Sequence, residues 1–422
     1  MQGFLGFIVN EVLSQPAVIA GLMALIGLVA LRKPARTVLT GTLKTIIGFL
    51  ILGVGADVIT STLNPLGTVL QEGFGINGVI PNNEAIVALA VDDFGRQTAI
   101  IMSLGFVFNL VFARLTPLKY VFLTGHHTFF MACLISAVLT TAGMGGGLLI
   151  LVGSVILGFL MVAIPALGQP FMRRITGDDN IAIGHFGTVG YVASALVGKW
   201  FGNPEKSTEE VKVPKGFGFL RDTTVSTALT MVVIYVFVVL SAGPDASAGV
   251  AGGQNYIAFA VLQGLMFAVG LYVILAGVRM MLAEIVPAFQ GIAEKIVPDA
   301  KPALDCPVTF NFAPTAVIIG FLSSFLGGLI GLGILAAVGA TVIIPGLVPH
   351  FFTGATAGVF GNATGGRRGA FLGALANGLL ISFLPALLLP VLGDLGFQNT
   401  TFGDADFAVV GIVIGFFASL FQ

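Results

Sequence analysis

Long apolar stretches separated by short polar intervals dominate this chain. An α-helix needs roughly 20 apolar residues to cross the hydrocarbon core of a bilayer, and most of these stretches are that long. The pattern therefore predicts ten or eleven membrane-spanning helices. The strongest stretches cover about 4–31, 38–63, 98–114, 119–142, 145–170, 223–242, 255–282, 313–344, 369–392 and 406–421.

Three shorter apolar segments, near 84–91, 181–198 and 346–362, contain glycines and polar residues. Such segments survive at membrane depth only when they are buried in protein or line a cavity, so they predict half-helices or re-entrant segments. The charged interval 199–222 predicts a cytoplasmic loop. Arg32 and Lys33 follow the first span, so the positive-inside tendency places that end in the cytoplasm and the N-terminus outside.

Composition supports a membrane protein and excludes several functions. Charged residues make up 9% of the 422 residues and hydrophobic residues 56%, whereas soluble domains carry roughly 25% charge. The net charge of −1 argues against nucleic-acid binding. Cys133 and Cys306 do not form a disulfide framework, and the four histidines and two cysteines lack the spacing of a metal site. We expect no metal, no cofactor and, without a Gly-Lys-Ser/Thr sequence, no ATP use.

An internal repeat is visible at an offset of 222 residues. We interpret the chain as one integral membrane domain, 1–422, with a first repeat half at 30–198, a cytoplasmic loop at 199–222 and a second half at 223–422. The alternative to a true repeat is chance similarity in a glycine-rich chain. Amphipathic segments near 57–72 and 283–297 predict interfacial helices or extensions of spans. Asp57 and Arg279 occupy equivalent positions in the repeat and are a candidate ion pair. The identical residues are Gly48, Gly55, Pro65 and Glu72 in the first half and Gly270, Gly277, Pro287 and Glu294 in the second.

Polar side chains inside apolar segments are costly in a membrane and therefore mark candidate functional residues. Adjacent helical residues point about 100° apart, so we expect only one of His126 and His127 to face a cavity, and favour His126. The alternatives are structural histidines and, for the Asn and Asp residues, helix N-caps. We expect His126, His185 and Asp305 to line one cavity near the membrane midplane, and further candidates are Asn82, Asn83 and Glu84 in a Pro-bounded loop.

An ordered set of short motifs resembles the membrane (IIC) component of the bacterial ascorbate-specific phosphotransferase system, among the ascorbate/galactitol-type permeases. The resemblance implies an all-α polytopic protein, embedded in the lipid of the bacterial cytoplasmic membrane, with about eleven spans and inverted repeats. It also implies a homodimer in which each chain has a core part and a dimerisation part. The motifs are Gly75-Ile76-Asn77-Gly78, Leu123-Thr124-Gly125-His126, Ile183-Gly184-His185, Gly277-Val278-Arg279-Met280, Asp305-Cys306, Phe312-Ala313-Pro314 and Ile344-Pro345-Gly346 through Gly365-Gly366.

The same resemblance implies a function and a substrate site. A separate IIB protein bearing phosphocysteine would phosphorylate an ascorbate-like sugar bound by His126, His185 and Asp305, so no catalytic residue is expected on this chain. Phe130 and Phe186 stand where the family has glutamines, which predicts a more apolar wall. The alternative is an ion-coupled transporter that uses Asp57, Glu84 or Asp305. An inward, ionised Glu84 would repel the ascorbate anion by roughly 4 kcal/mol at 4 Å.

Overall fold

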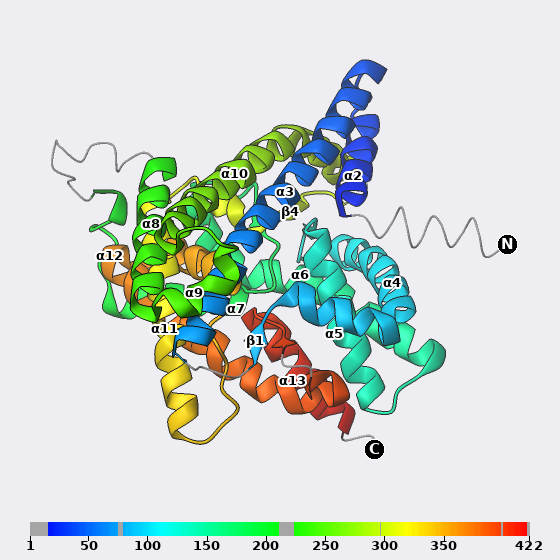
Figure 1. Cartoon of the computed structure of the whole chain (residues 1–422). Coiled ribbons are helices and arrows are strands. Elements are labelled where there is room, and N and C mark those ends of the chain that lie inside the picture. The colour runs from blue at the N-terminus through cyan, green and yellow to red at the C-terminus, as the bar shows by residue number, and fades with distance from the viewer. Residues whose placement is uncertain (1–15, 75–78, 211–222, 296, 398–399, 420–422) are drawn as a thin grey trace.

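The computed structural model describes residues 16–74, 79–210, 223–295, 297–397 and 400–419, and most of them are helical (Figure 1). The helices are α2 (Pro16–Ala30), α3 (Ala35–Phe74), α4 (Asn83–Leu115), α5 (Gly125–Thr141), α6 (Gly146–Thr176), α7 (Thr188–Phe201), α8 (Thr223–Ala242), α9 (Pro244–Ala251), α10 (Tyr256–Lys295), α11 (Pro314–Ala337), α12 (Leu347–Leu388) and α13 (Ala405–Ser419), with 3₁₀ turns η2 (Thr208–Glu210), η4 (Cys306–Thr309) and η5 (Leu389–Phe397).

Within the described residues, four helical segments are long and apolar enough to cross a membrane. Large apolar side chains such as Phe159, Leu262 and Leu326 are exposed on them, which suits a surface in contact with lipid rather than water. The chain is therefore a multi-pass membrane protein. The four segments are Gly146–Thr176, Tyr256–Val273, Pro314–Ala337 and Val348–Gly393.

One predicted interruption is wrong, because α4 runs without a break from Asn83 to Leu115. The predicted amphipathic segments likewise continue the long helices α3 and α10, which lie side by side (Figure 1). Arg279 donates to Asn311 Oδ1 at 3.4 Å, and no ion pair within the described part of the chain joins it to Asp57.

Helix α12 is a hairpin of two antiparallel arms that meet at Gly366. Its φ of 58° lies in the left-handed region, and a side chain there would collide with the carbonyl oxygens of Asn203 and Lys206 at 2.3 Å, so glycine is required. Asn377 on the second arm donates to Thr353 Oγ1 on the first at 3.2 Å. The two arms correspond to the predicted segments 346–362 and 369–392.

Short parallel strands, which the sequence did not predict, connect distant parts of the chain. Strand β1 (Ile80–Pro81) pairs with β5 (Thr400–Thr401), and β4 (Lys301–Leu304) lies between β2 (Tyr120–Phe122) and β3 (Ala182–Ile183). Pairing of these strands gives hydrogen-bond partners to the backbone N–H and C=O groups of the non-helical segments between helices. Buried non-helical backbone needs such partners.

Two short helices, α7 and α13, begin directly after strands β3 and β5. The buried carboxylate of Asp406 in α13 accepts hydrogen bonds from the backbone N–H groups of Thr188 (3.0 Å) and Val189 (2.7 Å) at the start of α7. The Asp406 N–H in turn donates to the Phe186 carbonyl at 3.0 Å. Because α7 has 14 residues, it spans about 21 Å, less than a bilayer core, as expected of a half-helix.

The contact between α11 and α12 is tested by adding one methyl group. A Cβ on Gly378 would lie 2.0 Å from the Ser324 carbonyl oxygen, whereas a Cβ on Gly333 meets nothing within 4 Å. We expect Gly378→Ala to destabilise the protein by about 1–3 kcal/mol through overpacking, and Gly333→Ala to leave it unchanged or slightly more stable. Thermal unfolding in detergent measures both; equal midpoints would contradict this packing.

The Asp406 cap is tested by Asp406→Asn. An amide cannot accept from both N–H groups with a carboxylate's strength, so we expect a loss of about 1.5–3 kcal/mol and faster hydrogen exchange at Thr188 and Val189. Asp245→Asn, in the exposed first turn of α9, is the matched control and should have little effect. Unchanged exchange at α7 in Asp406→Asn would show that the cap does not order this helix.

Candidate functional site

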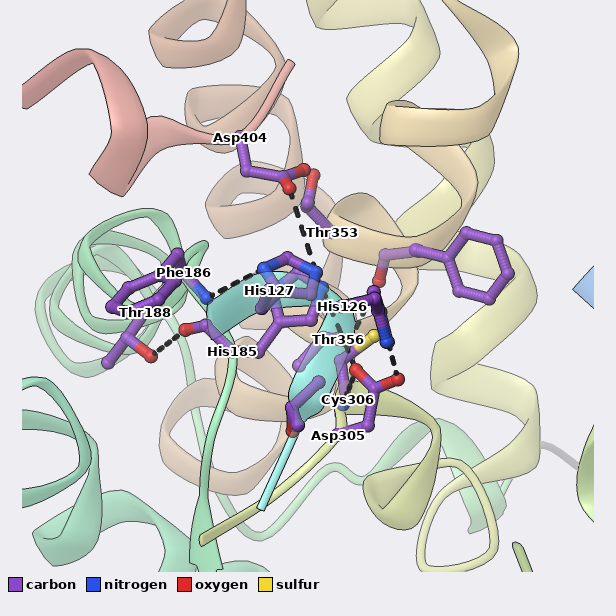
Figure 2. A network of polar contacts seen from close by, with 12 residues as sticks. His126, His127, His185, Phe186, Thr188, Asp305, Cys306, Thr353, Thr356 and Asp404 are labelled. Carbon is purple, nitrogen blue, oxygen red and sulfur yellow. Dashed lines mark hydrogen bonds and ion pairs between the residues drawn. The ribbon is translucent and has the colours of Figure 1, made fainter. Parts of the chain in front are cut away.

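Four chain segments, each following a strand, meet at one polar cluster (Figure 2). His126 and His127 begin α5 after β2, and His185 follows β3. Asp305 follows β4, and Asp404 follows β5. Because Ile183 pairs with Leu304, the parallel register carries His185 and Asp305 to the same edge of the sheet.

Asp305 lies between two imidazoles at one end of the cluster. Its Oδ2 is 3.5 Å from His126 Nε2, and its Oδ1 is 3.8 Å from His185 Nε2. Oδ1 also accepts a hydrogen bond from the Cys306 N–H at 2.7 Å and so caps η4. The carboxylate therefore has a capping role through Oδ1 and still presents Oδ2 toward His126. The side chains of His126 and Asp305 are 30% and 11% exposed, which leaves this end of the cluster open.

His127 forms the centre of the cluster and is buried. Its Nδ1 accepts from the Phe186 N–H at 3.3 Å, so in the neutral ring the proton lies on Nε2. That Nε2 faces Asp404 Oδ2 at 4.0 Å. The His127 ring also contacts the His185 ring, with 3.8 Å between centroids, and stacks on Phe407.

Asp404 closes the opposite end of the cluster, as Figure 2 shows. Asn83, the first residue of α4, donates to Asp404 Oδ2 at 2.8 Å and accepts from the Gly403 N–H at 2.8 Å. The start of α4 is thus tied to the turn before α13. Two carboxylates therefore lie on opposite sides of three imidazoles.

Aromatic rings surround the polar groups. Phe130 lies edge-on to His126, with 5.8 Å between centroids, and Phe186 stacks on Phe122 at 4.9 Å. The Tyr191 hydroxyl is 2.7 Å from His185 Nδ1 and fixes the orientation of that ring. Such faces and edges can pack against the apolar side of a sugar ring, while the carboxylates and imidazoles can bind its hydroxyls.

An ion-pair group outside the apolar segments holds the start of β4. Asp179, in the turn after α6, binds Lys301 and accepts from Arg173 Nε (2.7 Å) and Gln169 Nε2 (2.8 Å). Partial burial alone would raise the pKa of Asp179, but the hydrogen bonds from Arg173, Lys301 and Gln169 outweigh it and hold this pKa well below its usual range. Lys301 lies four residues before Asp305, so the anchored strand sets the position of the candidate site.

The structure brings together most of the predicted site residues: His126, His185, Asp305, Phe130, Phe186 and Asn83. Asn82 lies beside them, and its N–H donates to the Thr401 carbonyl at 2.9 Å. The Glu84 side chain and the Gly75-Ile76-Asn77-Gly78 motif lie outside the described residues.

Of the two neighbouring histidines, His126 lies at the open end of the cluster with 30% of its side chain exposed, whereas His127 is buried but also belongs to the cluster. The cluster wraps around the first turn of α5, so His126 reaches Asp305 while His127 points toward Asp404. The sequence analysis missed Asp404 and Tyr191. Asp404 stands just before the apolar stretch 406–421, and a carboxylate in that place is the sequence signal that could have found it.

Comparisons with known proteins identify the family to which the chain belongs. The family model EIIC-GAT, described as "PTS system sugar-specific permease component", matches residues 11–406. The "Ascorbate-specific PTS system EIIC component" of Mycoplasma pneumoniae is 27% identical over 417 residues, which cover 86% of this chain and 63% of that protein. The chain thus spans less than two thirds of that relative's length. The family match extends over nearly the whole chain, and the protein belongs to the sugar-specific permease components of phosphotransferase systems.

Proposed function

We propose that this protein is the IIC permease of a phosphoenolpyruvate-dependent phosphotransferase system in the bacterial cytoplasmic membrane. It binds ascorbate or a similar small sugar or sugar acid and moves it across the membrane for phosphorylation by a separate IIB protein. The observation that carries this proposal is the placement of Asp305 between His126 and His185, in a chain of the permease family. The similarity to an ascorbate-specific relative favours ascorbate.

The proposed substrate ligands form two groups. The carboxylate of Asp305 accepts hydrogen bonds from sugar hydroxyls, and the imidazoles of His126 and His185 donate or accept them. Asn82, Asn83 and Glu84 contribute from the start of α4, and Phe130 and Phe186 provide the apolar side. The buried pair of Asn83 and Asp404 keeps the start of α4 in register with the site.

Basic residues favour one face as the cytoplasmic side. Lys119 precedes β2, Lys301 begins β4 and Arg173 ends α6, a concentration expected on the cytoplasmic face. Lys301 and Asp305 are four residue steps apart in extended chain, which is about 13 Å at 3.3 Å per residue. The substrate would therefore lie within reach of that face, from which a phosphorylated IIB protein approaches.

We further propose that 30–198 and 223–422 are inverted repeats on either side of the 199–222 loop. Helix α3 begins at Ala35 and α10 at Tyr256, 221 residues later, and both have 40 residues. Strand β1 pairs with β5 of the other half, just as β4 pairs with β3. This reciprocal pairing supports a substrate core at the repeat interface. From the resemblance to the permease family we also propose about eleven spans and a separate dimerising part in a homodimer.

Substitution of Asp305 tests the proposed ligand. Asp305→Asn keeps the volume but removes the charge, and a charge-assisted hydrogen bond contributes about 1.5–3 kcal/mol. We expect the affinity for ascorbate, measured by calorimetry on the purified protein, to fall roughly 10- to 150-fold. Asp245→Asn is the control and should bind as the natural protein does. Unchanged affinity in Asp305→Asn would leave Asp305 with its capping role alone.

Vesicle uptake separates the proposal from the alternative of an ion-coupled transporter. We expect accumulation to require phosphoenolpyruvate, the general phosphotransferase proteins and a IIB partner, and the product to be a phosphorylated sugar. Ionophores should leave the rate unchanged when phosphoenolpyruvate is supplied directly. Uptake of unmodified sugar driven by an ion gradient alone would favour the alternative, with Asp305 as a coupling residue.

A further inference from the structure

Three groups that bind transition metals meet at the end of β4. His185 Nε2, an Asp305 carboxylate oxygen and Cys306 Sγ all lie within 4.8 Å of one another. We propose that they form a binding site for Zn²⁺ or a similar divalent transition metal. The site was not expected from the sequence, because residues 185 and 305–306 become neighbours only through the pairing of β3 with β4.

The ligand types and separations suit zinc. Zinc bonds to histidine nitrogen and carboxylate oxygen are about 2.0–2.2 Å and to cysteine sulfur about 2.3 Å, so tetrahedral ligand atoms lie roughly 3.3–3.8 Å apart. His185 Nε2 and Asp305 Oδ1 are already 3.8 Å apart. Side-chain movements of about 1 Å would complete the set, and the fourth position would face His126, whose Nε2 is 3.5 Å from Asp305 Oδ2.

Charge balance favours a divalent cation here. A carboxylate and a thiolate neutralise the two positive charges of the metal, so the loaded centre is neutral in its low-dielectric surroundings. Tyr191 also supplies the outer partner that metal-binding histidines usually have, with its hydroxyl 2.7 Å from His185 Nδ1. When His185 Nδ1 carries the proton, its Nε2 is free to bind the metal.

Two other combinations of ligands in the cluster depend on His127. They are less suitable, because His127 Nδ1 already accepts from the Phe186 N–H and the proton must then lie on Nε2. His127 is also buried, whereas the Asp305 side chain and its neighbour His126 are 11% and 30% exposed. A metal ion would therefore enter from the side of His126.

The consequence for transport is competition between metal and sugar. Bound zinc would occupy both Asp305 and His185, so it would exclude a substrate that uses the same groups. This consequence rests on the proposed function, whereas binding of the metal itself does not. Transport by this protein would then be inhibited by zinc at concentrations that load the site.

The binding experiment uses the purified protein with Zn²⁺ in calorimetry and Co²⁺ as a spectroscopic probe. Cys133→Ser is a matched variant, because Cys133 is buried in α5 outside the ligand set and the chain has only two cysteines. We expect one ion per chain and a thiolate-to-cobalt charge-transfer band in the natural protein and in Cys133→Ser, where Cys306 is the remaining thiol. Cys306→Ser should lose the band and at least about 10-fold in zinc affinity.

Absence of the thiolate band in Cys133→Ser, or equal zinc affinity in the natural protein and Cys306→Ser, would overturn the proposal. X-ray absorption at the zinc edge of the loaded natural protein gives a test that does not depend on a variant: one sulfur ligand is expected, and none would contradict the site. Ascorbate titrations with and without Zn²⁺ test the competition separately. If zinc binds with the thiolate signature and ascorbate affinity is unchanged, the metal site stands and the shared substrate site fails.

Discussion

An unpaired peptide group inside a bilayer costs several kcal/mol, and this constraint controls how the chain can leave one membrane helix and enter the next. In this protein the extended segments before α4, α5, α7, α11 and α13 have backbone groups that no helix satisfies. Parallel pairing of β1 with β5, and of β4 with β2 and β3, provides those hydrogen bonds. Because each strand pair joins distant parts of the sequence, the pairing also determines which side chains become neighbours.

The polar cluster follows from these pairings. Parallel strands end at the same edge of a sheet, so the residues that follow β2, β3 and β4 converge there, and His126, His185 and Asp305 lie one to four residues after these strands. Two carboxylates outside the cluster hold the arrangement in place. Asp406 caps α7 beside His185, and Asp179 holds Lys301 at the beginning of β4. Most of the polar atoms in the cluster thus have fixed positions, as a site that recognises a small polar ligand requires.

Much of this arrangement could be predicted from the sequence, for identifiable reasons. Apolar segment length revealed the membrane helices, and the cost of polar groups in apolar surroundings singled out His126, His185 and Asp305. The strands could not be predicted, because segments of two to four residues have no detectable periodicity and their pairing is set by tertiary contacts. The contact of His127 with Asp404 could not be predicted for a related reason: helical spacing fixes the angle between neighbouring side chains but not where other segments pack around them. Asp404 was missed because its partners, Asn83 and His127, lie more than 270 residues away in the chain.

The central claim is that the parallel strand pairs assemble a single sugar site in which Asp305 lies between two imidazoles. An experimental structure of the protein in lipid, determined with ascorbate bound, tests this most directly. The account predicts density for the sugar at the open end of the cluster, with its oxygens within hydrogen-bond distance of Asp305 and of at least one of His126 and His185. Ascorbate bound elsewhere in the protein, with Asp305 contacting only protein groups, would contradict it.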